Sequence, residues 1–148
     1  MPVVKTDAVG HGVSSRPATS LTASAVSTTT AGTISGTTAA GAAPTVAIPS
    51  GFVATDRAGT FDLTAVTGGG AQAAGVVATV RFAAEYASTP AAVVVTLHNT
   101  TPTPDVPIIA SATAVATTGF DVLVAAALTT ANVYRISYQV IPGGAAGL

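Results

Sequence analysis

Histidine and carboxylate side chains, which supply most acid–base and metal chemistry, are sparse in this sequence of 148 residues. The two histidines are His11 and His98, and the six Asp and Glu residues are scattered along the chain. His98 and Asn99 begin an expected loop that also holds Asp105, so these three side chains could converge on a ligand. A metal site needs several ligands in a suitable geometry, and we favour a loop histidine that bonds to the backbone.

Motifs for nucleophilic or phosphate chemistry are also missing. The chain has no cysteine, and its serines lack the Gly-x-Ser-x-Gly setting of a nucleophile elbow. The three glycines at 68–70 are followed by neither a Gly-Lys-Ser/Thr motif nor a helical pattern, so they predict a turn rather than a phosphate loop. We therefore predict no catalytic, cofactor-binding or metal-binding residues, no cofactor, and a protein that is not an enzyme.

The composition excludes further classes of protein. Hydrophobic residues make up 49% of the chain and charged residues 7%, and the formal net charge is -1. A nucleic-acid-binding protein needs clustered cations, and a disordered polyelectrolyte needs a high net charge. No stretch reaches the ~20 consecutive apolar residues of a membrane-spanning helix, and we see no signal-peptide pattern at the N-terminus. We therefore expect neither nucleic acid nor membrane as a partner.

The elements that would position any site divide near residue 50. Residues 1–50 are rich in Ala, Thr, Ser and Gly and hold only Leu21, Ile34 and Ile48 as larger aliphatic side chains. Large side chains dominate the energetics of a core, so we predict an extended N-terminal arm at 1–50 and a β-sandwich domain at 51–148. All seven aromatic residues lie in the second part: Phe52, Phe61, Phe82, Tyr86, Phe120, Tyr134 and Tyr138.

The second part has the alternating pattern of half-buried strands. In residues 60–66, Phe61, Leu63 and Ala65 share one face while polar residues occupy much of the other. The segment 91–97 is apolar on both faces, which predicts a central strand or one at an interface. These strands favour an all-β fold, an antiparallel β-sandwich or a jelly-roll-like domain. The predicted strands cover residues 60–66, 75–82, 91–97, 108–116, 120–124 and 133–140.

Three segments resemble a β-domain family of tailed-bacteriophage virion proteins. In residues 80–99 a strand ends in Phe, a link contains Tyr-Ala-Ser-Thr-Pro, and a Val-rich strand ends near Asn. Residues 115–122 contain the Thr-Thr-Gly-Phe hairpin of the same domains, and residues 134–141 are similar to their closing strand. The family includes capsid decoration, head-fibre and tail-fibre-tip proteins.

The resemblance implies a structural role in the virion, on the outer surface of the capsid. We expect a decoration, or cement, protein or a head-fibre protein that stabilises the head, with the major capsid protein and further copies of itself, as a homotrimer, as partners. The arm would contact the capsid or neighbouring subunits, and the apolar strand at 91–97 would form the trimer interface. The expected arm contacts are Val3, Val4, Val9, Val13, Leu21, Val26 and Ile34. The expected trimer contacts are Val93, Val95 and Leu97.

Two alternatives place the chain in the phage tail. A tail-fibre or receptor-binding tip would recognise a host surface glycan, for which Tyr86, Asn99 and Asp105 are candidate contacts. A tail-tube component would need a helix packed on the sheet, and the sequence predicts no such helix.

Overall fold

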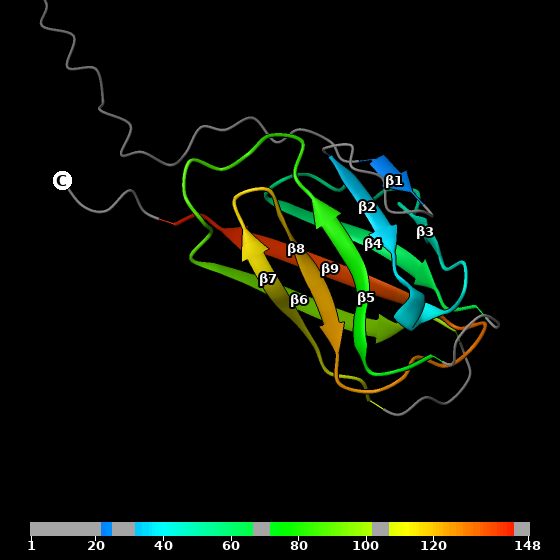
Figure 1. The fold of residues 1–148 in the computed structure, drawn as a ribbon. Coiled ribbons are helices and arrows are strands. Elements are labelled where there is room, and N and C mark those ends of the chain that lie inside the picture. Colours follow the sequence, from blue (N-terminus) through cyan, green and yellow to red (C-terminus); the bar gives the residue numbers. More distant parts are fainter. Residues whose placement is uncertain (1–21, 25–31, 67–71, 102–106, 144–148) are drawn as a thin grey trace, which may run out of the picture.

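Strands dominate the computed structural model of the protein (Figure 1). It describes residues 32–66, 72–101 and 107–143, together with the backbone of residues 22–24. The described strands are β1 (Thr22–Ser24), β2 (Thr33–Gly36), β3 (Thr45–Ala47), β4 (Ala58–Thr64), β5 (Gly75–Arg81), β6 (Ala92–Asn99), β7 (Ala110–Ala116), β8 (Gly119–Val124) and β9 (Val133–Ile141), with a short 3₁₀ helix at Thr38–Ala40. This confirms the predicted all-β fold. Within the described residues, no helix has the length and apolar character needed to cross a membrane.

The strands form two sheets. One has the order β1-β2-β5-β8-β7 and the other the order β3-β4-β9-β6. The pairings are antiparallel except for β1 with β2. Two connections are local: β3 to β4, and the hairpin of β7 and β8 around the predicted turn at Thr117 and Thr118. The chain changes sheet at each of the steps β2 to β3, β4 to β5, β5 to β6, β6 to β7 and β8 to β9.

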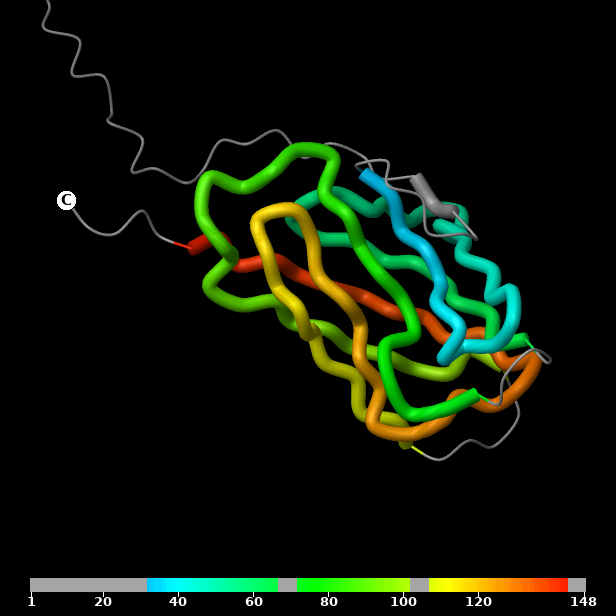
Figure 2. The backbone as a smooth tube through the Cα atoms, in the orientation of Figure 1, coloured from blue at the N-terminus to red at the C-terminus, as the bar shows by residue number. Residues whose placement is uncertain are grey.

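The core lies between the two sheets, which face one another as layers in Figure 2. Phe61 and Leu63 of β4 are fully buried, as the period-2 pattern predicts. The aromatic rings interlock, since Phe120 lies 5.3 Å from Tyr138 and 6.0 Å from Phe82 between ring centroids. The two sheets thus form a β-sandwich with an aromatic centre.

A β-bulge changes the face that β5 presents to the core. The pairing of β5 with β8 shifts between Val76 and Ala78, and Val77 and Ala78 are both fully buried. Strict alternation directs the side chains of Val77 and Ala78 to opposite faces of the sheet, so the sequence pattern assigns one of them to the outer face. The extra residue of a bulge removes that constraint, which explains the difference.

The sandwich begins before residue 50, because β2 and β3 belong to its two sheets. β2 pairs with β5 and β3 pairs with β4, so the stretch expected as an arm contributes a strand to each layer. In the segment between β2 and β3, the Ala40 carbonyl accepts a hydrogen bond from the backbone N–H of Val66 at 3.1 Å. A Cβ at Gly41, whose φ is +119°, would lie 2.0 Å from the Val66 carbonyl oxygen. The described end of the predicted arm is therefore part of the domain.

The apolar strand at 91–97 corresponds to β6, which lies at an edge of its sheet and not in the centre. Its side chains alternate between exposed and half-buried positions. Both faces read as apolar in sequence because valine and alanine are tolerated on the exposed side. Apolar residues on the solvent side of a strand are common in folded proteins, so composition alone does not identify a central strand.

Candidate interaction surface

The predicted arm contacts divide between two parts of the chain. Val3, Val4, Val9, Val13, Leu21 and Val26 lie outside the residues whose side chains the structure describes. Ile34 is fully buried in the core of the sandwich, where it lies opposite Val80 of β5. A side chain enclosed by its own domain has no surface to offer to a capsid. Ile34 is therefore a core residue of the sandwich and not a contact of an arm.

The predicted trimer contacts, Val93, Val95 and Leu97, point inward from β6 and pack against the core while remaining half-buried. The side chains exposed on the other side of β6 include Val94 and Thr96. A flat contact on the outer face of the sheet would therefore reach Val94 and Thr96 rather than the three predicted residues.

The residues singled out for ligand chemistry do not converge on a site. His98 is exposed on β6, while Tyr86 is nearly buried and donates its hydroxyl to the Asp56 carbonyl at 2.8 Å. Asn99 accepts a hydrogen bond from the backbone N–H of Thr101 at 2.9 Å, within its own turn. Asp105 lies outside the described residues. Among the residues described, no three His, Cys, Asp or Glu side chains gather in a way that could hold a metal ion.

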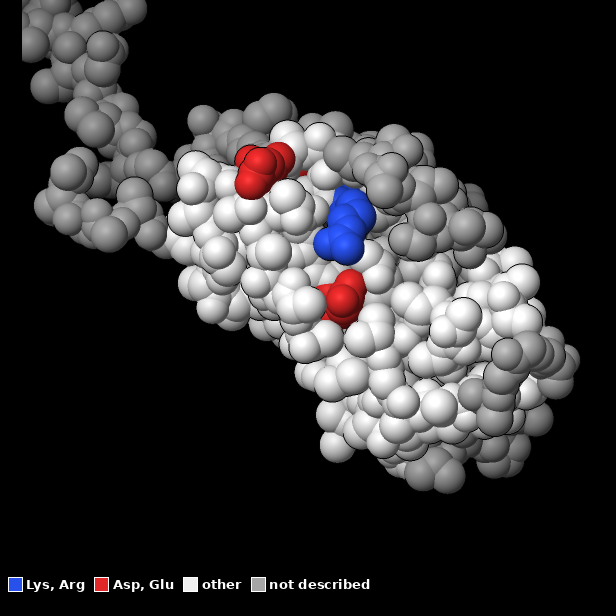
Figure 3. All heavy atoms as spheres, viewed as in Figure 1, with Lys and Arg blue, Asp and Glu red and all other residues white. Residues whose placement is uncertain are grey.

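Charge is sparse on the visible face of the five-stranded sheet, where small basic and acidic patches interrupt an otherwise uncharged surface (Figure 3). Within this sheet, the Asp121 carboxylate accepts the Thr79 hydroxyl at 2.8 Å. This face thus offers little of the charge that steers a highly charged partner.

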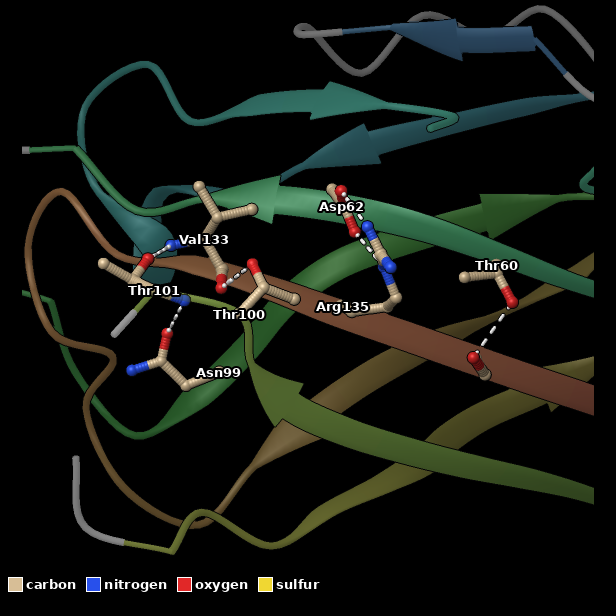
Figure 4. A network of polar contacts seen from close by, with 8 residues as sticks. Thr60, Asp62, Asn99, Thr100, Thr101, Val133 and Arg135 are labelled. Carbon is tan, nitrogen blue, oxygen red and sulfur yellow. Dashed lines mark hydrogen bonds and ion pairs between the residues drawn. The ribbon is translucent and has the colours of Figure 1, made fainter. Parts of the chain in front are cut away.

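The outer face of the four-stranded sheet carries an ion pair between neighbouring strands (Figure 4). Arg135 of β9 donates through Nε and Nη2 to the two carboxylate oxygens of Asp62 on β4, at 2.8 and 2.9 Å. The hydrogen bond to Asp62 raises the pKa of Arg135. Arg135 also lies over the ring of Phe52, with its Cζ 4.8 Å from the ring centroid, a distance typical of a cation–π contact.

The phase of the β4–β9 ladder explains why these side chains meet. The backbone N–H of Val140 donates to the Arg57 carbonyl at 2.7 Å, which places Asp62 and Arg135 at a pair without main-chain hydrogen bonds. Side chains are closer together at such pairs. The next pair of this kind is Thr60 with Ser137, and their hydroxyl oxygens lie 2.9 Å apart.

Two adjoining hollows cross this face and together form what we call the outer groove. They share Ala58, Ser137 and Tyr138 in their walls. Gly59 of β4 has no room for a side chain, since a Cβ there would lie 2.7 Å from the Tyr138 hydroxyl. The full lining consists of Gly51, Phe52, Val53, Ala58, Gly59, Thr60, Val94, Thr96, Ser137, Tyr138 and Gln139.

Exposed apolar side chains mark both ends of the outer groove. Phe52 is 44% exposed and Val53 67% at one end, and Val94 is 50% exposed at the other. Hydroxyl groups of Thr60 and Ser137 lie between them and bond to one another. An apolar surface with few polar groups suits contact with another protein chain.

The loop at residues 49–58 forms one wall of the groove and is anchored from both layers. The Tyr138 hydroxyl donates to the Thr55 carbonyl at 2.6 Å, and the Tyr86 hydroxyl donates to the next carbonyl along the chain. The buried Asp56 carboxylate accepts the backbone N–H groups of Ala83 at 2.7 Å and Ala84 at 3.1 Å. These bonds hold Phe52 and Val53 in place at the surface. Only the tertiary structure shows this arrangement, because its members are far apart in sequence.

Tyr138→Phe tests this anchor, and we expect it to lower the free energy of unfolding by about 1 kcal/mol because one buried hydrogen bond is lost. Burial, with a smaller contribution from the Asp56 charge, raises the pKa of Tyr138 above its ordinary value of 10.0. In the unfolded chain the phenol ionises near its ordinary pKa, whereas the folded protein keeps it neutral. The stabilisation from Tyr138 is therefore complete below pH 10 and is lost as the pH rises above it.

Urea unfolding on either side of pH 10 checks this expectation. Stability should fall with rising pH in the wild type and should fall less steeply in Tyr138→Phe, which cannot ionise at this position. Equal slopes in the two proteins would contradict the role given to Tyr138.

Comparisons with known proteins add no relative. No protein-family model matches the sequence, and neither curated proteins nor solved structures give a match. The sandwich and the outer groove therefore carry the functional argument together with the sequence.

Proposed function

We propose that this chain is a structural protein of a tailed-phage particle, a capsid decoration or head-fibre protein that binds the major capsid protein on the outside of the head and stabilises it. The observation that supports this most is the outer groove, with Phe52, Val53 and Val94 exposed and no Lys, Arg, Asp or Glu in its lining. The similarity of residues 80–99, 115–122 and 134–141 to virion β-domains supplies the setting.

The N-terminal segment has its own part in this proposal. Residues 1–21 precede the first described strand and contain five of the apolar residues predicted to contact a capsid or a neighbour. Small and β-branched side chains suit an extended segment that adds a strand to a neighbouring sheet. Many copies on one shell would bind through several weak contacts each, so high affinity at any one contact is not required.

Co-sedimentation with capsids assembled from the major capsid protein of the same genome tests the proposal. Deletion of residues 2–21 ends before β1 and leaves Ile34 in place, so the sandwich should remain folded by circular dichroism. We expect this deletion to reduce capsid binding at least about tenfold, because it removes multivalent contacts.

A second variant separates the segment from the groove. Phe52→Ser with Val53→Ser changes only exposed side chains of the groove and leaves residues 1–21 intact. Loss of binding in this variant alone would assign the capsid contact to the groove and overturn the role of the segment. Undiminished binding by both variants, or a genome without a major capsid gene, would overturn the proposed function itself.

A receptor-binding tip that recognises a host glycan is the second candidate. The observation in its favour is the exposed aromatic ring of Phe52 beside Arg135 and the hydroxyls of the outer groove. Glycan-array binding that is lost in Phe52→Ser, without binding to capsids, would favour this function over decoration.

A further inference from the structure

The described strands give the two sheets four edges, of which three are short or interrupted. β1 and β3 have three residues each, which gives a neighbouring strand little to pair with. β7 has seven residues, but its pairing with β8 shifts between Thr113 and Ala116, and Ala114 has a φ of 47°. Short edge strands and bulges are two means by which sheets avoid pairing with other chains. The fourth edge, β6, has neither.

β6 is an eight-residue strand with no proline, glycine, Lys, Arg, Asp or Glu. One side pairs with β9 along its whole length. On the other side, no strand pairs with it among the residues that the structure describes. A long, uncharged strand of this kind is a template for the addition of a further strand.

The β6–β9 ladder determines which backbone groups face outward. The backbone N–H of Thr100 donates to the Val133 carbonyl at 2.8 Å, so even-numbered residues of β6 bond to β9. Val93, Val95 and Leu97 therefore direct their N–H and C=O groups toward the side on which no described strand pairs. The same three side chains are half-buried, so the edge presents apolar surface together with hydrogen-bonding groups.

The two ends of β6 are held in place before any partner binds. At one end, the Thr100 hydroxyl donates to the Val133 carbonyl, and the Thr101 hydroxyl oxygen accepts the Val133 N–H (Figure 4). At the other end, the N–H of Ala91 donates to the Ile141 carbonyl. An edge that is already ordered loses less conformational entropy on pairing.

We propose that β6 pairs with β6 of a second copy of this chain, antiparallel and about a two-fold axis at Val95. Val93 then lies opposite Leu97 of the second copy, and Val94 opposite Thr96. The pairing forms about six main-chain hydrogen bonds and joins the two four-stranded sheets into one.

The chemistry of the edge favours a second copy over another partner. In this register the inward-facing Val93 lies opposite Leu97, and both side chains are apolar. Neither copy of β6 carries a Lys, Arg, Asp or Glu that could repel the other. The symmetry is closed, because an antiparallel pair of identical strands uses the same surface twice. A cyclic trimer joins two different surfaces, so this edge accounts for a dimer and not for the trimer implied by the virion resemblance.

Cysteine cross-linking tests the pairing, because the full chain contains no cysteine of its own. Val94 and Thr96 are both exposed on the outer face. In the proposed register they lie opposite one another across the two-fold axis with Cα atoms about 4.5 Å apart, within the range of a disulfide. Two copies of the same residue lie about 8 Å apart, beyond that range.

An equal mixture of full-length Val94→Cys and Thr96→Cys should give a covalent dimer under mild oxidation, whereas each variant alone should give little. Ala47→Cys, exposed on the opposite edge strand β3, is the matched control and should not cross-link to Val94→Cys. Sedimentation velocity of the wild type at high micromolar concentration should show a dimer.

Charge reversal gives a second readout of the same register. Val94→Lys with Thr96→Lys places like charges opposite one another in both pairs and should dissociate the dimer. Val94→Glu with Thr96→Lys places opposite charges there and should retain it.

Each contrary result has a definite meaning. A monomer or a trimer by sedimentation, or no cross-link in the mixture, would overturn the proposal. A monomer is also the result expected if residues 1–21 of the same chain pair with β6 instead. Cross-linking by Thr96→Cys alone would overturn the register at Val95. None of these results depends on capsid binding, so they are distinguishable from failure of the proposed function.

Discussion

Ile34→Ala is expected to lower the free energy of unfolding by about 3 kcal/mol, within the range measured for large-to-small changes in protein cores. Ile34 is fully buried within its own domain: its exposed fraction is 0%, and it lies opposite Val80 in the pairing of β2 with β5. The substitution leaves a cavity between the sheets. Urea unfolding followed by tyrosine fluorescence measures the loss.

Val53→Ala is the matched control, since Val53 is 67% exposed and its truncation should change stability by less than about 0.5 kcal/mol. If Ile34→Ala were as stable as this control, residue 34 would belong to an arm after all. The result thus decides whether the domain begins before residue 50, independently of any partner.

Asp56→Ala is expected to cost about 3 kcal/mol, because it removes a buried carboxylate that accepts two backbone N–H groups. The exposed fraction of Asp56 is 0%, and its oxygens lie 2.7 Å from the Ala83 nitrogen and 3.1 Å from the Ala84 nitrogen. Relief of the buried charge offsets part of this loss. Asp56→Asn keeps one carbonyl acceptor and should fall between the wild type and the alanine variant.

Asp62→Ala is the control for Asp56→Ala, because it removes a carboxylate from the outer face. Its ion pair with Arg135 is partly exposed, and we expect a loss below about 1 kcal/mol. Hydrogen exchange should show faster opening of residues 53–58 in Asp56→Ala than in Asp62→Ala. Equal stability of the two variants would contradict the structural role of Asp56.

The predictions for Asp56 and Tyr138 bear on function through the position of the 49–58 loop. Asp56 and Tyr138 hold the loop against the sandwich, and the loop in turn presents Phe52 and Val53 at the outer groove. A variant that frees the loop should therefore weaken any contact made through the groove even when the sandwich remains folded.

Much of the strand content could be predicted from local pattern. Phe61 and Leu63 alternate with polar residues, and the predicted strand at 133–140 alternates Tyr134, Ile136 and Tyr138 with more exposed positions; all five side chains are buried. Alternation is a local property, because successive side chains of a strand point to opposite faces. The hairpin turn at Thr117 and Thr118 is equally local.

The candidate site could not be predicted in the same way. The contacts predicted for ligands or partners rest on side-chain type, whereas the outer groove depends on which strands are neighbours. Arg135 donates a hydrogen bond to Asp62, and Tyr138 donates one to the Thr55 carbonyl; the partners are more than 70 residues apart in sequence in each case. No local signal points to these pairs, since many other polar residues in the chain have similar surroundings in sequence.

By itself, the sequence determined that this chain is all-β, poor in charge and short of groups for acid–base catalysis, because composition and period-2 alternation are properties of the chain alone. The tertiary structure decided that β2 joins the core, that β6 is an edge strand, and that residues of β4, β6 and β9 line a groove. The physical reason is that every strand carries the same main-chain donors and acceptors. Local pattern selects the buried face of a strand, but only packing of the whole chain selects its neighbours.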